Sequence, residues 1–271
     1  MIDRRTLAFG IGGLAVASLI ASSVGWGWAD ATHTDLARRL ASPSPTHWLG
    51  QDGLGRDVLA RVVLGARVSF GVAAAVVTLS LVVGVAVGSI AALAGGWTDL
   101  VIARAIDVVL AFPGLLLAIA LAAVWGPGIG NLVLALSALG WTGYARLARS
   151  EVLRLRRAAF VEAAEALGAS PVALALRHVL PLAAPALLVQ CTFGVSGAIV
   201  AEASLSFLGL GVPPPTPSWG SMLDEGRQFL LVAPHLVLAP GMALAATVLA
   251  LQLFGDGLRD WLDVRDPDRR L

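Results

Sequence analysis

Residues 160–181 read FVEAAEALGASPVALALRHVLP and belong to a charged segment between two apolar runs. The first part, residues 161–167, has strong helix-forming composition. Gly168 follows, and glycine tolerates the left-handed conformation at a helix end. Ser170 and Pro171 then suit the cap and first turn of a second helix, because the missing N–H of proline costs nothing there. The segment predicts two short helices around a bend, with the next helix beginning or kinking at Pro181.

The composition around this segment is that of an integral membrane protein. The 271 residues are 57% hydrophobic and 14% charged, whereas a soluble domain is nearer one quarter charged. All 19 basic residues are arginine, which excludes a Walker phosphate loop because that loop needs a lysine. Any nucleotide hydrolysis must then be done by another chain. Cys191 is the one cysteine; it allows neither a disulfide nor a cysteine metal cluster within the chain and is interpreted as a small core residue.

Five runs free of Asp, Glu, Arg and Lys are long enough to cross a hydrocarbon core, which takes about 20 helical residues. They are residues 7–29, 68–94, 108–145, 179–201 and 228–255. The third run is broken by the turn-rich sequence WGPGIGN at 125–131 and is counted as two spans. A cleaved signal peptide is the alternative for the first run, but its apolar stretch is longer than a usual signal core. The sequence therefore predicts an all-α membrane protein with six transmembrane helices.

The arginines predict the orientation. With the N-terminus inside, thirteen of the 19 arginines lie on the cytoplasmic side, as the positive-inside rule requires. Both termini and residues 160–181 are then cytoplasmic. The predicted order is a first transmembrane segment at 1–29, an extracytoplasmic loop at 30–67, a five-helix core at 68–256 and a cytoplasmic tail at 257–271. The core includes a cytoplasmic loop at 150–181 and an outer proline-rich loop at 205–233.

The end of the first outer loop has the pattern of a short helix lying in the outer membrane interface. Its apolar face holds Val58, Leu59, Val62 and Val63, and the charged residues Arg56, Asp57 and Arg61 lie elsewhere on it. The polar residues His47, Asp52 and Asp57 could be imagined as metal ligands. They are interpreted instead as solvated residues and helix caps, so no metal site is predicted.

Three stretches resemble one family of transport proteins. Glu162-Ala163-Ala164, followed by Gly168 and then Leu180-Pro181, resembles the EAA loop of ABC importer membrane subunits. The family's looser consensus has an aliphatic residue at His178, and the variant RHVLP at 177–181 is similar to that of the peptide and nickel permease subgroup. The sequence HWLGQDGLGRD at 47–57 resembles the segment before the second span in that subgroup. LSFLGLGVPPPTPSWGSML at 205–223 resembles an outer loop of the second membrane subunit. The resemblance covers about residues 48–260.

The resemblance implies a type I ABC importer permease fold and one half of a transmembrane pore in a bacterial inner membrane, with no catalytic activity of its own. The implied partners are a homologous permease in a heterodimer, two cytoplasmic ATPases and an extracytoplasmic substrate-binding protein. ATP and magnesium would be bound by the ATPases, and neither a cofactor in this chain nor nucleic acid is expected. The residues implied to couple to the ATPases are Glu162, Ala163, Ala164, Gly168, Ser170 and Pro171. Di- or oligopeptides are the expected substrates, and nickel or another metal chelate is the alternative.

Three polar residues of the fifth span are candidates for the translocation path: Glu202, Gln190 and Thr192. Glu202, at the edge of the hydrocarbon, either lines the passage and meets a charged group such as a peptide amine, or is an interfacial carboxylate that reaches water. Gln190 and Thr192 lie deeper, where such residues also serve helix–helix contacts.

Two other classes of protein were weighed. The sequence GVSG at 194–197 is the local pattern of rhomboid-type intramembrane serine proteases, with Ser196 as the nucleophile. Its base would be His235, which is expected about 13 Å away in depth, beyond hydrogen-bonding reach. A channel or an export-type half-transporter is the other class, but a channel has no reason to carry a segment that docks an ATPase.

Overall fold

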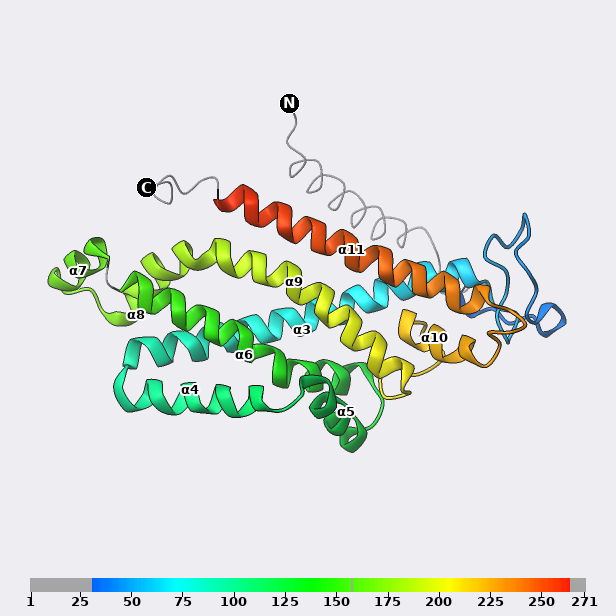
Figure 1. Ribbon diagram of the computed structural model, residues 1–271, viewed down its shortest axis with the longest axis horizontal. Coiled ribbons are helices and arrows are strands. Elements are labelled where there is room, and N and C mark those ends of the chain that lie inside the picture. The colour runs from blue at the N-terminus through cyan, green and yellow to red at the C-terminus, as the bar shows by residue number, and fades with distance from the viewer. Residues whose placement is uncertain (1–30, 157, 264–271) are drawn as a thin grey trace, which may run out of the picture.

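The computed structural model describes residues 31–156 and 158–263, and these residues are helical with no strand. Six long helices make up most of the molecule (Figure 1): α3 (Val58–Ala94), α4 (Gly96–Ala111), α5 (Gly114–Trp125), α6 (Ile129–Leu155), α9 (Leu180–Phe207) and α11 (His235–Asp263). The short elements are η1 (Leu36–Arg38), α7 (Ala159–Ala166), α8 (Pro171–Leu174), the π-helical turn η2 (Ala175–Val179) and α10 (Trp219–Arg227).

Within the described residues, three stretches are long and apolar enough to cross a membrane: α3, Ala175–Phe207 and His235–Leu262. The pair α4 and α5 makes a fourth if the two helices, bent by 85°, count as one broken span. The expected first span at 7–29 lies outside the described residues. The all-helical membrane fold is confirmed, and the six spans and the cytoplasmic termini stay predictions.

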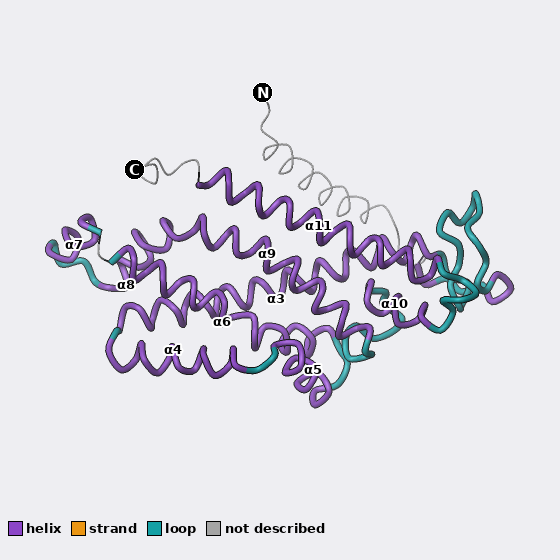
Figure 2. Tube along the Cα trace, in the orientation of Figure 1, coloured by secondary structure: helices purple, strands orange, loops and turns teal. Residues whose placement is uncertain are grey.

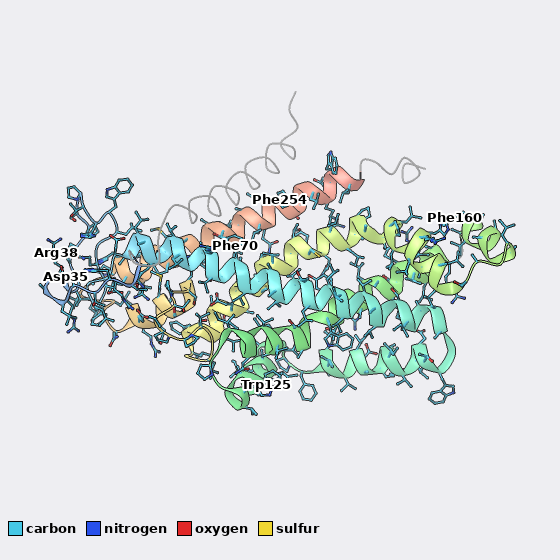
Figure 3. The ribbon with its side chains drawn as sticks, turned by 180° about the vertical axis from the view of Figure 1, so that it is seen from behind. Asp35, Arg38, Phe70, Trp125, Phe160 and Phe254 are labelled. Carbon is cyan, nitrogen blue, oxygen red and sulfur yellow. The ribbon has the colours of Figure 1, made fainter. Side chains whose placement is uncertain are left out.

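Most of the loops lie at two opposite ends of the bundle, and the link between α4 and α5 lies between these ends (Figure 2). One end, which we call the outer end after its predicted side, carries residues 31–57 and the segment around α10. The other, the cytoplasmic end, carries α7, α8 and the turn at Gly95. Figure 3 shows the same division, with Asp35 and Arg38 at the outer end and Phe160 at the opposite end. Segments predicted to share a side of the membrane therefore lie at the same end of the molecule.

The centre of the bundle is the contact between α3 and α6, and two glycines allow it. A Cβ atom on Gly88 would lie 2.2 Å from the carbonyl oxygen of Ala145, and one on Gly84 would lie 2.5 Å from that of Trp141. Both neighbours are backbone atoms, so a larger residue would push the helices apart. Small residues at such contacts are typical of membrane helices, because packing rather than hydrophobic burial holds those helices together.

The prediction of a separate interfacial helix before the second span is wrong. The helix α3 runs without a break over 37 residues, about 55 Å, which is longer than the hydrocarbon core of about 30 Å. Its first two turns are covered by protein: Val58 and Val62 pack against Met222 of α10 and Leu236 of α11. The apolar face in the sequence is therefore a contact with α10 and α11 and does not mark a separate element.

The third apolar run breaks at the expected place and at one more. As predicted, α5 ends at Trp125 and α6 begins at Ile129. A further break falls at Phe112 and Pro113, because proline lacks an N–H and holds the residue before it in an extended conformation. The helix α4, which ends at this break, begins at Gly96. The sequence had predicted that the span begins at Val108.

Candidate functional site

Residues 159–181, which we call the coupling segment, have the predicted form. The helix α7 ends at Ala166, Gly168 has φ +85°, and α8 begins at Pro171. The side-chain oxygen of Ser170 accepts a hydrogen bond from the backbone N–H of Ala173 at 3.3 Å, as a helix cap does. The predicted bend between two helical pieces is confirmed, but the second piece is the first turn of a longer helix, because the helical conformation runs on from α8 through η2 into α9. The sequence forms the bend because Gly168 adopts a left-handed conformation that most side chains disfavour.

The coupling segment has a buried anchor and an exposed tip. Val161 is 1% exposed, whereas Leu167, one residue before the bend, is 89% exposed and Phe160 is 43% exposed. Ala163 and Gly168 are also exposed, and Ala164 is partly so. The alanines, Gly168 and Ser170 of the predicted coupling set thus lie on the accessible surface, while Glu162 lies within α7 and Pro171 begins α8. Exposed large apolar side chains on a short projecting segment suit contact with another protein.

On its other side the coupling segment is joined rigidly to the bundle. The helical conformation continues from α8 through η2 into α9 with no intervening loop. Val179 in η2 packs against Val152 and Leu155 of α6. The guanidinium of Arg156, just after α6, donates to the carbonyl oxygens of Ala92 and Leu93 in α3, at 3.0 and 3.3 Å. Displacement of the coupling segment would therefore act directly on α9 and on the ends of α3 and α6.

The three predicted path residues do not share one surface. Gln190 lines a cavity of about 330 Å³ between α3, α5, α6 and α9, together with Ser80 and Tyr144. Thr192 instead donates to the carbonyl oxygen of Val189 at 2.8 Å, and its hydroxyl faces Gly255 of α11. Thr192 is therefore a helix–helix contact, as its alternative interpretation held.

Neither interpretation of Glu202 matches its surroundings, because both expected an accessible carboxylate. Glu202 is fully buried. Its carboxylate accepts hydrogen bonds from Ser69 of α3 and from Ser206, each at 2.7 Å. The Ser206 hydroxyl in turn accepts from the backbone N–H of Val212 at 3.2 Å. Glu202 thus joins α9 to α3 and to the turn that follows α9, and no part of it faces a passage or the solvent.

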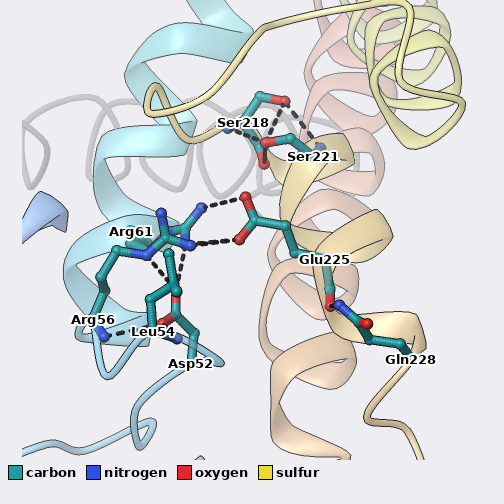
Figure 4. Close-up of polar contacts among 8 residues, drawn as sticks. All are labelled: Asp52, Leu54, Arg56, Arg61, Ser218, Ser221, Glu225 and Gln228. Carbon is teal, nitrogen blue, oxygen red and sulfur yellow. Dashed lines mark hydrogen bonds and ion pairs between the residues drawn. The ribbon is translucent and has the colours of Figure 1, made fainter. Parts of the chain in front are cut away.

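At the outer end four charged residues form one network (Figure 4). Arg56 donates to Asp52 and to Glu225 of α10, each at 2.7 Å. Arg61 in α3 donates to Asp52, and it contacts Glu225 with both terminal nitrogens, at 2.8 and 3.1 Å. Arg61 is 1% exposed. The network therefore fixes the first outer loop and the start of α3 to α10.

The charge balance of this network holds Asp52 ionised. Burial alone would raise the pKa of the Asp52 carboxyl, but the guanidinium groups of Arg61 and Arg56 outweigh it. The backbone N–H groups of Arg56 and Leu54, which donate to the same carboxylate, act in the same direction. The pKa of Asp52 consequently lies below its usual range.

Of the other two residues weighed as metal ligands, Asp57 caps a helix and His47 contacts the Asp57 carboxylate. One carboxylate oxygen of Asp57 accepts from the backbone N–H of Ala60 at 2.8 Å, which caps α3. The second lies 2.7 Å from Nδ1 of His47. The capping prediction is confirmed for Asp57, while the interpretation of Asp52 as solvated is wrong, since Asp52 is 7% exposed and paired with two arginines.

Comparison with known proteins decides the family. Residues 84–265 match the family described as binding-protein-dependent transport system inner membrane component. The matched part includes the coupling segment, Gln190 and Glu225 of the charged network. The chain belongs to this family. It is an inner-membrane component of a transport system that works with a substrate-binding protein, as the resemblance implied.

The family assignment extends to close relatives that cover most of the chain. The glutathione transport system permease protein GsiD of Pectobacterium atrosepticum is 42% identical over 229 residues, which are 84% of this chain and 76% of the relative. The proteins of the same name from Shigella dysenteriae serotype 1 and Escherichia coli O157:H7 are each 45% identical over 221 residues, 82% of this chain and 73% of theirs. Each of these relatives is named as a permease protein of a glutathione transport system.

The protease interpretation does not fit this family or this geometry. The Ser196 hydroxyl donates to the carbonyl oxygen of Phe193 at 2.8 Å and accepts from the amide nitrogen of Gln252 at 3.3 Å. Gln252 lies 17 residues beyond His235 in the same helix α11, about 25 Å along its axis. Ser196 therefore forms a contact between α9 and α11.

Sequence reasoning missed the charged network and the cavity wall. Arg56 and Arg61 were placed on the polar side of a surface helix, because their acceptor Glu225 is 164 residues away from Arg61 in sequence. One signal could have pointed to it: opposite charges in both outer loops, Asp52 and Arg56 in the first and Glu225 in the second. Tyr144 and Ser80, beside Gln190, gave no signal within their apolar runs.

Proposed function

We propose that this chain forms one half of the pore of an ATP-driven peptide importer. Two cytoplasmic ATPases would supply the energy, a homologous permease the other half of the pore, and a substrate-binding protein the captured peptide. ATP and magnesium would be bound by the ATPases, and this chain would catalyse no reaction itself. The observation that carries the proposal is the coupling segment, which projects an exposed apolar tip from a family member and continues as helix into the bundle.

The physical mechanism is a lever. ATP binding closes the two ATPases, and the coupling segment, seated on them, moves with them. Because α8, η2 and α9 are one continuous helix, this movement tilts α9 against α3 and α6. The bundle then alternates between an outward-open and an inward-open arrangement, and ATP binding biases the equilibrium between the two. Glu162 would contribute charge pairing to the ATPase, Ala163 and Ala164 close approach, and Gly168 the bend.

The test replaces the glycine at the bend. Gly168 has φ +85° and no atom within 4 Å of where a Cβ would be, so Gly168→Val keeps the backbone N–H and creates conflict only with the bend itself. Gly126 offers a matched control at the far end of α5, with φ +80° and equally open surroundings. Both variants should insert into the membrane and assemble with the partner permease. Transport-coupled ATP hydrolysis should be lost in Gly168→Val and kept in Gly126→Val; normal coupled turnover in Gly168→Val would refute the coupling role.

For the substrate, we propose small peptides of the glutathione type. The support is that the relatives are named as permeases for glutathione transport and not for nickel transport. The test is uptake into proteoliposomes that hold the complete complex and its binding protein, with glutathione, a dipeptide and a nickel chelate as separate probes. Uptake of the nickel chelate alone would contradict the proposal.

A further inference from the structure

The cavity that Gln190 lines has a buried floor and an exposed rim. It has a volume of about 330 Å³ and is surrounded by α3, α5, α6 and α9. Ser80 of α3 and Tyr144 of α6 belong to its floor and are 1% and 4% exposed. Gly114 of α5 and Gly197 of α9 belong to its rim and are exposed. The cavity therefore opens between α5 and α9, and we call it the central pit.

The central pit lies inside the hydrocarbon core, away from both predicted membrane surfaces. On α3, Ser80 is 13 residues beyond the exposed Arg67 and eight residues before Gly88, which correspond to about 20 and 12 Å. Gly88 contacts Ala145 of α6, which is followed by the exposed, charged Arg146. A hydrocarbon core of about 30 Å thus fits between the levels of Arg67 and Arg146, and Ser80 lies within it.

Two hydroxyls at the floor of the pit have no partner. Within the described residues, neither the Ser80 nor the Tyr144 hydroxyl makes a hydrogen bond. The thiol of Cys191 lies near the Tyr144 hydroxyl, but a thiol is a weak hydrogen-bonding group. The hydroxyls of Thr142 and Ser196, by contrast, each donate to a carbonyl oxygen of their own helix at 2.8 Å. Because a buried polar group without a partner is costly, above all in hydrocarbon, the two free hydroxyls require a polar occupant of the pit.

The lining of the pit defines the chemistry of this occupant. A lipid chain would leave both hydroxyls unpaired, because it offers no hydrogen bond. None of the described residues that line the pit is charged, so the pit offers no counter-ion to the ends of a peptide. Hydroxyls and the side-chain amide of Gln190 can each donate and accept a hydrogen bond. A peptide group has the matching pair, one N–H donor and one C=O acceptor.

We propose that the central pit binds an uncharged peptide group of the substrate while the substrate crosses the membrane. Between transport events water fills the pit, since a polar cavity of this size holds water, and the peptide group replaces part of that water. Because every peptide contains this group, the pit does not distinguish one peptide from another and leaves selection to the binding protein. This inference rests on the proposed function, because it names the part of the substrate that the chain contacts.

The first experiment tests whether the pit is hydrated and needs no substrate. In the complete complex with Cys191→Ala as background, Ala198→Cys places a thiol at a position that lines the pit and is 6% exposed. Val200→Cys is the control, because Val200 is 42% exposed on the same helix but does not line the pit. A small water-soluble methanethiosulfonate reagent should modify position 198 and not position 200, because the reacting species is a thiolate. No reaction at position 198, or equal reaction at both positions, would overturn the proposal.

The second experiment removes one hydroxyl and measures uptake. Tyr144→Phe keeps the ring and should lower uptake at subsaturating glutathione about tenfold, the factor that corresponds to 1.4 kcal/mol, because a hydrogen bond to the peptide group is lost. Uptake of alanyl-alanine should fall by the same factor, since it shares that group. The unfolding temperature should not fall, because the hydroxyl has no hydrogen bond within the described chain to lose.

The matched control is Thr142→Val, two residues away on α6, whose hydroxyl is bonded to the carbonyl oxygen of Leu139. This variant should keep wild-type uptake, and both variants should copurify with the ATPases and the second permease. Wild-type uptake by Tyr144→Phe would refute the peptide contact and show that the pit holds water only. An equal loss of uptake in Thr142→Val would also refute it, since that hydroxyl is already paired.

The two experiments separate this inference from the proposed function. A wild-type complex that imports neither glutathione nor alanyl-alanine would refute the proposed function, and the reactivity of position 198 would still show whether the pit is hydrated. A complex that imports glutathione but is unaffected by Tyr144→Phe would refute the inference alone.

Discussion

Replacing Gly88 by alanine tests the contact on which the bundle is built. The added Cβ would lie 2.2 Å from the carbonyl oxygen of Ala145 and 2.9 Å from its carbonyl carbon. An ordinary contact needs about 3.4 Å, so α3 and α6 would have to separate by roughly 1 Å, and gaps of that size forfeit a quarter to a half of the dispersion attraction. Overpacking of this kind costs about 1–3 kcal/mol.

The control for this prediction is Gly71→Ala in the same helix, where an added Cβ meets nothing within 4 Å. Alanine is favoured over glycine in a helix by up to about 1 kcal/mol, and this gain applies to both variants. The difference between them therefore isolates the overpacking cost. We expect Gly88→Ala to unfold in detergent at a lower temperature than Gly71→Ala, by several degrees. Equal unfolding temperatures would refute the assignment of Gly88 as a close-contact position.

A neighbouring glycine shows why the identity of the contacted atom matters. A Cβ on Gly140 would lie 2.5 Å from the hydroxyl oxygen of Ser80, which is a side-chain atom. The double variant Gly140→Ala with Ser80→Ala should thus recover the stability that Gly140→Ala loses. The backbone oxygen of Ala145 cannot be removed by any substitution, so Gly88→Ala has no equivalent rescue.

Three further predictions concern the polar residues. Asp52→Asn leaves the buried Arg61 with Glu225 alone and should lower the free energy of unfolding by at most about 3 kcal/mol. The control is Asp224→Asn, which breaks the exposed pair with Arg227 and should lower the free energy of unfolding by under about 1 kcal/mol. The pKa of Asp52 is lowered in the folded protein. The stabilisation from its charge is therefore full above the unfolded pKa of about 3.9 and is lost as the pH falls through the folded pKa. The difference in unfolding temperature between wild type and Asp52→Asn should shrink below about pH 4, and a constant difference would contradict the charge role. Glu202→Ala should cost about 1–3 kcal/mol for each serine donor left unpaired, and Glu202→Gln much less, as seen in thermal unfolding; equal losses would argue against the serine contacts. Ser196→Ala should leave peptide uptake unchanged, and loss of a proteolytic activity in that variant would revive the protease interpretation.

Local chemistry allowed the coupling segment to be predicted in detail from the sequence. Gly168, Ser170 and Pro171 act through their own backbone and their immediate neighbours, so their roles in a bend and a cap can be inferred without knowledge of the fold. The break at WGPGIGN is of the same kind. The break at Pro113 was missed because a single proline inside an apolar run is tolerated in many membrane helices, and only the 85° bend shows that here it ends one.

The polar residues could not be placed because their partners are distant in sequence. Glu202 depends on Ser69, 133 residues earlier, and Arg61 on Glu225. A carboxylate near a predicted membrane boundary has the same pattern in the sequence whether it faces water, substrate or two serines.

The position of Glu202 also constrains how the proposed lever can work. The continuous helix from Pro171 to Phe207 is about 55 Å long, and it is held at both ends: by Val179 against α6 at the cytoplasmic end, and by the Glu202 contacts with Ser69 and Ser206 at the outer end. A helix anchored in this way cannot absorb a displacement of the coupling segment by bending freely at its far end. The π-helical turn at Ala175–Val179 is one irregular part of its path, and such turns occur at functional positions of helices. Pro185 inside α9 is another, because an interior proline removes a helical hydrogen bond. Because Ser69 of α3 donates to Glu202 of α9, we expect α3 and α9 to move together at the outer end when the coupling segment is displaced.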